Sequence, residues 1–206
     1  MKSKTIILLL LMAFSSSLFA QVAKMSKGTI GITYSALGVS DVNNWERATL
    51  AGAASYSGKS FYTVGVTYIH PIRSWLDIET GVEYSSHTIR TKPMQMPGEN
   101  YIDAPDDKVS LINIPVTARI NFLNHFFVNG GVLLDIETGG SSPIDSHNGL
   151  GAILGVGAKY SLDNGIGAFA NLYTKFHSLV PFTAEFDSYR WRLIEGGLRV
   201  GLTYSF

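Results

Sequence analysis

The feature that most constrains this chain is its final stretch, residues 196–206, in which apolar residues alternate one by one with small or charged residues. The apolar side chains occupy the even positions and end in two aromatics, Tyr204 and Phe206. A period of two places every second side chain on the same face of a β-strand. At about 3.3 Å per residue and a tilt of about 40°, the strand covers about 25 Å, close to the apolar band of an outer membrane. The stretch therefore predicts a transmembrane β-barrel strand, paired at both edges.

The same alternation recurs along the chain and predicts eight strands. They cover roughly residues 28–37, 60–70, 75–87, 109–121, 126–137, 150–161, 166–176 and 189–206. In the central parts of these segments the apolar residues occupy even positions, and no even position is charged, although 16% of the chain is charged. A charge at the middle of a bilayer costs about 2–4 kcal/mol, so contact with lipid explains the exclusion. We therefore predict an all-β fold, an eight-stranded antiparallel up-and-down transmembrane β-barrel.

Alternation alone does not say which face is outside, because a soluble barrel of the lipocalin kind has an apolar interior and the same period. Here the odd positions carry glycines and charges of both signs, which suit a narrow polar lumen. Aromatic residues on even positions gather near both strand ends, as in interfacial girdles. These observations favour a membrane barrel. The residues expected to form a lumenal charge network are Asp77, Glu79, Glu83, Arg119, Asp135, Lys159, Lys175 and Arg199.

The two ends of the predicted barrel differ in the length of their connections. Short connections span residues 70–74, 121–125 and 161–165, and long ones span residues 38–59, 90–108, 138–149 and 177–188. In outer-membrane barrels short turns face the periplasm and long loops face outward, so we expect both termini in the periplasm.

The first twenty residues have the pattern of a secretory signal peptide. Lys2 and Lys4 precede an apolar run too short to span a bilayer, and a serine-rich segment then ends in Leu18-Phe19-Ala20. We expect residues 1–20 to be the signal peptide and residues 21–206 to be one outer-membrane barrel domain. The formal net charge is zero and no basic cluster occurs, so nucleic acid is not an expected partner. The chain has no cysteine, which excludes disulfides and thiolate metal sites.

Two stretches resemble the PorT-like outer-membrane β-barrel family of Gram-negative bacteria. Residues 75–85, Trp-Leu-Asp-Ile-Glu-Thr-Gly-Val-Glu-Tyr-Ser, are similar to a family strand ending in Gly-x-x-Tyr-Ser, and residues 111–116 are similar to its Ile-Pro strand. The resemblance implies an eight-stranded barrel inserted by the outer-membrane assembly machinery, with Tyr204 and Phe206 as the assembly signal. It implies no catalytic residues. It would also account for Pro115, which cannot donate a ladder hydrogen bond in mid-strand and predicts a bulge or local widening there.

Histidines near the long connections raise the question of chemistry. His87, His147 and His177 lie close in sequence to serines and aspartates, from which a Ser–His–acid triad or a cation site could be assembled. No nucleophile motif marks them, and the aspartates at 103, 106 and 107 match no known calcium loop. We therefore predict no catalytic, cofactor-binding or metal-binding residue.

The long connections carry apolar and aromatic residues that would either pack as a cap over the barrel mouth or bind a protein or glycan. The candidate loop contacts are Trp45, Tyr101, Phe182 and Phe186. We predict a non-enzymatic outer-membrane protein that contacts outer-membrane lipid and acts through extracellular loops, or as the accessory of an envelope or secretion complex with an envelope protein as partner. The alternatives are a lipid-modifying enzyme at the outer rim and a narrow channel along the lumenal charges.

Overall fold

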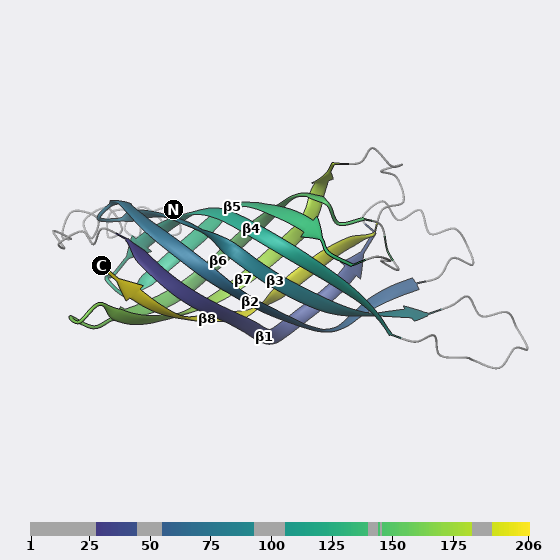
Figure 1. Cartoon of the computed structure of the whole chain (residues 1–206), viewed down its shortest axis with the longest axis horizontal. Coiled ribbons are helices and arrows are strands. Elements are labelled where there is room, and N and C mark those ends of the chain that lie inside the picture. Colours follow the sequence, from purple (N-terminus) through teal and green to yellow (C-terminus); the bar gives the residue numbers. More distant parts are fainter. Residues whose placement is uncertain (1–27, 45–54, 93–105, 140–143, 145, 183–190) are drawn as a thin grey trace, which may run out of the picture.

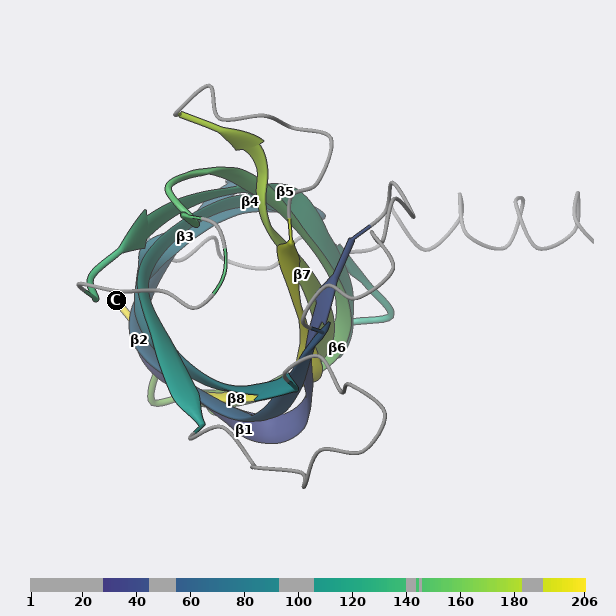
Figure 2. The ribbon, with the colours of Figure 1, turned by 90° about the vertical axis from the view of Figure 1, so that its right-hand side faces the viewer.

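The computed structural model describes residues 28–44, 55–92, 106–139, 144, 146–182 and 191–206. Within them, eight antiparallel strands form one closed ring and pair in chain order (Figure 1). The strands are β1 (Thr29–Asn43), β2 (Ser55–Arg73), β3 (Leu76–Lys92), β4 (Asp107–Phe122), β5 (Phe126–Glu137), β6 (Gly149–Ser161), β7 (Ile166–Pro181) and β8 (Arg192–Ser205). Figure 2 shows the ring seen along its axis. No helix of the described residues is long and apolar enough to cross a membrane.

The final strand closes the barrel, as its sequence predicts. β8 pairs with β7 along one edge and with β1 along the other, where Leu202 lies opposite Ile32 and Tyr204 opposite Ile30. A closed ring leaves no edge whose N–H and C=O groups would meet lipid without a hydrogen-bond partner.

The two faces of the sheet have the predicted orientation. On the outer face Ile32 and Leu202 are 63% and 62% exposed, whereas on the inner face Asn113 and Lys175 are 0% and 1% exposed. Water would not favour this arrangement, because it leaves a continuous apolar belt outside and charges inside. A bilayer favours it, so the predicted transmembrane barrel is confirmed and the lipocalin-like alternative is wrong.

The strands extend further toward the long connections than the alternation predicts. β2 begins at Ser55 and not near residue 60, and β7 ends at Pro181 and not at residue 176. Beyond the apolar belt the outer face no longer contacts lipid, so the lipid-facing pattern ends before the strand does. The short connections, 74–75, 123–125 and 162–165, lie at the opposite end of the barrel, which we call the short-turn end; the other is the long-loop end.

Two irregularities reverse the alternation toward the long-loop end. In β1 the pairing with β8 shifts between Ser35 and Leu37, so Leu37 faces outward and Ser40 inward, against the even-outward rule. In β2 the pairing with β3 shifts between Gly58 and Ser60, and the even-numbered Tyr56 packs against the buried apolar residues at this end. An extra residue in one strand moves all later side chains to the other face, which the local sequence pattern does not reveal.

Pro115 interrupts the sheet without a bulge. β3 and β4 pair at Thr80 with Val116 and again at Glu83 with Asn113, with the register unchanged across the gap. The Thr80 hydroxyl donates a hydrogen bond of 2.9 Å to the Pro115 carbonyl and bridges the interruption. The predicted bulge is therefore wrong, and the gap in the ladder agrees with the alternative, a local widening.

Candidate functional site in the barrel interior

The lumen at the short-turn end holds a polar bridge beside a cavity of about 320 Å³. Lys159 Nζ donates a hydrogen bond of 2.6 Å to Asn121 Oδ1, and Asn121 Nδ2 donates one of 2.7 Å to Asp77 Oδ2. Asp77 and Lys159 are both inside the barrel, but an amide side chain connects them in place of a direct ion pair.

On the side of this bridge toward the long-loop end, the rings of Phe127 and Phe169 and the guanidinium of Arg119 fill the lumen. We call these three side chains the Arg–Phe layer. The Arg119 guanidinium lies 3.5 Å from the ring centre of Phe127 and 5.1 Å from that of Phe169. The two rings meet edge to face at a centre distance of 6.2 Å. Each ring lies opposite a glycine, Gly157 on β6 and Gly201 on β8, where any side chain would overlap it. These glycines therefore make room for the layer that blocks the lumen.

The middle of the lumen holds a chain of ion pairs that alternates in sign. Arg199 binds Glu79 at 2.8 Å and Glu83 at 3.2 Å, and Lys175 binds Glu83 at 2.7 Å. At its lower end Glu79 also lies 3.6 Å from Arg119. All these side chains are buried, so each charge depends on its neighbours to offset the loss of water.

At its upper end this chain reaches Glu195, an inward-facing residue of β8 that the sequence analysis did not select. Lys175 Nζ lies 3.4 Å from Glu195 Oε1, and the Tyr173 hydroxyl donates a short hydrogen bond to the same oxygen. Tyr173 also contacts the Ser35 hydroxyl at 2.8 Å. Position 195 is odd, so the parity of β8 would have indicated that it faces the lumen.

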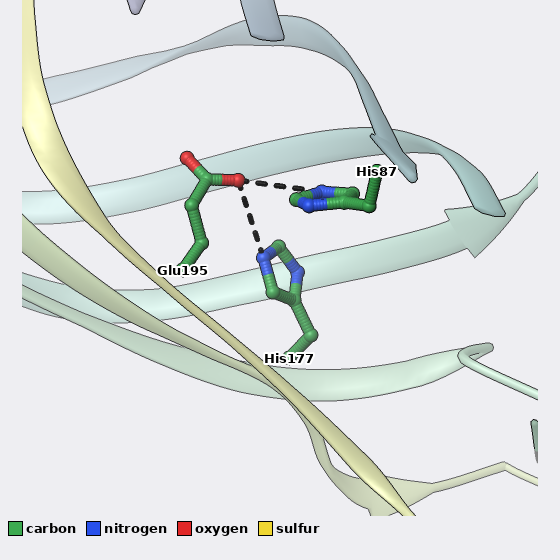
Figure 3. Close-up of side chains that lie close together, drawn as sticks. All are labelled: His87, His177 and Glu195. Atoms are coloured by element: carbon green, nitrogen blue, oxygen red, sulfur yellow. Dashed lines mark ion pairs between the residues drawn. The ribbon is translucent and has the colours of Figure 1, made fainter. Parts of the chain in front are cut away.

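Glu195 meets two histidines, and Figure 3 shows that the three side chains converge. His87 Nε2 on β3 and His177 Nε2 on β7 lie 3.4 Å and 3.6 Å from the same carboxylate oxygen, Glu195 Oε2. The imidazole rings are 5.5 Å apart and nearly perpendicular. All three side chains are 0% exposed. We call these residues the histidine–glutamate cluster.

In both histidines the second ring nitrogen, Nδ1, contacts another polar side chain, which fixes the orientation of the ring. His177 Nδ1 lies 3.0 Å from Asp135 Oδ1, and His87 Nδ1 lies 2.9 Å from Ser40 Oγ. Asp135 is itself fixed, because it accepts hydrogen bonds from Asn113 Nδ2 at 2.7 Å and from the Ser178 backbone N–H at 2.8 Å. Asp135 thus contacts a histidine and not the lysines and arginines of the predicted charge network.

Above the cluster, apolar side chains at the long-loop end pack together. The members of this apolar cluster are Val42, Ile89, Val109, Leu111, Ile144 and Leu193, with Tyr56 and Trp191 packed against it. Most of them come from strand ends, whereas the cap that the sequence analysis gave as one of two alternatives would be built from loop residues. Of the candidate loop contacts, Trp45, Tyr101 and Phe186 lie outside the described residues, and Phe182 is 59% exposed.

No protein-family profile matches the chain, and no curated protein matches it either. Among solved structures the chain is similar to the outer membrane protein OprG from Pseudomonas aeruginosa, with 12% identity and a TM-score of 0.49 over 88% of this chain and 97% of that one. It is also similar to the outer membrane protein AlkL, with 13% identity and a TM-score of 0.48 over 91% and 94%. The translocator domain of the autotransporter NalP from Neisseria meningitidis gives 11% identity and a TM-score of 0.34 over 99% and 96%. The resemblance to the PorT-like family stays a prediction.

The structure places all eight predicted lumenal charges on the inner face of the barrel and Tyr204 and Phe206 on its outer face, 52% and 58% exposed. His87 and His177 lie at the long-loop end, close to the long connections, but both rings face inward and are fully buried because the strands continue past them. Asp106 lies outside, where the Lys59 ammonium donates it a hydrogen bond of 2.6 Å that holds the pKa of its carboxyl below the usual value.

Proposed function

We propose that this chain is a non-enzymatic integral outer-membrane protein whose filled barrel is a rigid scaffold and whose long-loop end binds an envelope protein. The observation that carries the proposal is the filled lumen, in which the Arg–Phe layer and the paired charges occupy the space that a solute path would need. In the proposed arrangement the barrel spans the outer membrane with its short turns and both termini in the periplasm. The predicted signal peptide and the resemblance to the PorT-like family support an accessory role in an envelope or secretion complex.

Ion conductance tests the first part of the proposal. The refolded wild-type barrel in a planar bilayer should be electrically silent, because the Arg–Phe layer and the ion pairs close the lumen. The double variant Phe127→Ala/Phe169→Ala should stay silent as well, since the buried ion pairs still fill the middle of the lumen. Phe126→Ala removes an outward-facing ring next to Phe127 and is the matched control that should stay silent. Conductance of the wild-type barrel would favour the channel alternative.

Site-specific photocrosslinking in living cells tests the second part. A crosslinker at the exposed Phe182, at the long-loop end, should capture one protein partner. The same group at Leu202, within the apolar belt, should react with lipid alone. Capture of the same protein from both positions, or of none from Phe182, would contradict a partner at the long-loop end.

A lipid-modifying hydrolase is the second candidate function. Ser40, His87 and Glu195 follow one another at 2.9 Å and 3.4 Å, and these residue types form hydrolase triads. In such triads the serine meets Nε2, whereas Ser40 meets Nδ1, and Ser40 is only 4% exposed. We expect Ser40→Ala to leave the lipid A and phospholipid composition of the cells unchanged. Loss of one lipid species in that variant would favour the enzyme.

A further inference from the structure

We propose that the histidine–glutamate cluster binds one divalent transition-metal ion, with Zn²⁺ as the best fit, inside the long-loop end of the barrel. The ligand atoms are His87 Nε2, His177 Nε2 and Glu195 Oε2. Neither Nε2 atom has a hydrogen-bond partner among the residues that the structure describes, although both are fully buried. Two buried nitrogens directed at one carboxylate oxygen form a donor set suited to a metal ion, since imidazole and carboxylate are ligands that Zn²⁺ accepts.

The distances fit a tetrahedral ion. Two ligand atoms that each lie about 2.1 Å from a tetrahedral Zn²⁺ are about 3.4 Å apart. The two nitrogens lie 3.4 Å and 3.6 Å from Glu195 Oε2, and all three donor atoms lie within 4.8 Å of one another. Three protein ligands leave one of the four tetrahedral positions for a further ligand.

The surroundings of the cluster are those of a metal site. The carboxylate of Asp135 accepts the Nδ1 proton of His177, and the Ser40 hydroxyl is able to accept that of His87. In this tautomer both Nε2 lone pairs are available to an ion. Tyr173 and Lys175 bind Glu195 Oε1, and the Thr63 hydroxyl donates to both carboxylate oxygens at 3.4 Å and 3.5 Å. A carboxylate oxygen has two lone pairs, so Glu195 Oε2 keeps one for the ion. Each ligand side chain is thus oriented by a contact to an atom other than the one that would bind the metal.

An ion at this place would connect opposite walls of the barrel. His177 and Glu195 come from the neighbouring strands β7 and β8, whereas His87 comes from β3, which pairs with neither. The ligands are separated by 90 and 18 residues, so no local spacing could reveal them. Because all three side chains are fully buried, we expect Zn²⁺ to enter more readily during folding than after the apolar cluster has packed above the site.

Metal content after refolding tests the proposal. The full mature chain is refolded into detergent with zinc chloride, separated from free metal on a desalting column and analysed for zinc by mass spectrometry. We expect one Zn²⁺ per barrel, and at least about 100-fold weaker binding in the double variant His87→Gln/His177→Gln. The matched control is His70→Gln/His125→Gln, which removes two exposed histidines at the short-turn end and should bind like the wild type. Heat-modifiability on gels verifies that each variant is folded.

A second measurement needs no variant. Refolding with Co²⁺ should give the intense visible absorption bands of a tetrahedral ion, and zinc chloride present during refolding should suppress them. Absence of bound metal in the folded wild type, or full binding by His87→Gln/His177→Gln, would overturn the proposal and leave the cluster as an ion pair of His177 with its carboxylates. Asp135→Asn should weaken binding by about 10- to 100-fold, because it removes the acceptor that orients His177. Conductance is measured separately, so a conducting barrel would leave the metal proposal standing.

Discussion

At the residue scale, burial decides the value of an ion pair. Lys175 and Lys59 each hold a carboxylate at about the same distance, 2.7 Å and 2.6 Å, but Lys175 is 1% exposed and Lys59 is 50% exposed. Lys175→Met leaves Glu83 and Glu195 short of a buried partner and should lower the free energy of unfolding by about 3–5 kcal/mol. Lys59→Met should change it little, because water already screens that pair.

Urea titration of the refolded barrels in lipid vesicles measures both changes. Adding Glu83→Gln to Lys175→Met should recover part of the loss, because it removes one uncompensated charge. Equal effects of Lys175→Met and Lys59→Met would show that the lumenal pairs are hydrated and that the interior is not filled.

At the element scale, the sheet curves tightly around its own side chains because glycines on one strand leave space for aromatic rings of the neighbouring strand. Phe169 on β7 packs over Gly201 on β8, and Phe127 on β5 packs over Gly157 on β6. Gly201→Ala should lower the free energy of unfolding by about 1–3 kcal/mol, because the new Cβ would overlap the Phe169 ring in a packed interior. The urea midpoint in vesicles measures the loss.

Two variants control for the glycine effect. Gly139→Ala adds the same methyl group where nothing lies within 4 Å, so we expect stability close to that of the wild type. Phe169→Leu in the background of Gly201→Ala should recover stability, because a smaller side chain relieves the overlap. A Gly201→Ala loss that persists in the double variant would mean that the glycine is needed for the backbone of β8 and not for the ring.

At the scale of the whole molecule, the apolar belt predicts how the barrel responds to charge at different depths. Val66 is outward-facing on β2 between Tyr62 and Tyr68, whereas Ser60 is exposed on the same strand beyond Tyr62. Val66→Arg should destabilise the folded barrel in vesicles by about 2–4 kcal/mol, because it places a charge in the hydrocarbon. Ser60→Arg should cost about 0–1 kcal/mol near the interface. Equal costs would mean that this face does not contact lipid.

The sequence alone determined the architecture and the orientation of its faces. Alternation is a local property, because neighbouring side chains of a strand always point to opposite sides, and lipid excludes charge from one of them. The last strand therefore indicated a closed ring before any partner was known, and parity placed charges such as Glu83 and Arg199 in the lumen. The same rule failed in β1 after Ala36, where the pairing with β8 shifts and reverses the faces.

Only the tertiary structure decided which interior groups meet. Glu79 and Glu83 lie four residues apart on β3, yet both bind Arg199 of β8. The structure alone shows that Asp135 binds His177 and not a lysine. Contacts across a lumen depend on the tilt of the strands and on the register summed around the whole ring. No single stretch of sequence determines the tilt and the summed register. His87, His177 and Glu195 therefore become neighbours only when the barrel closes.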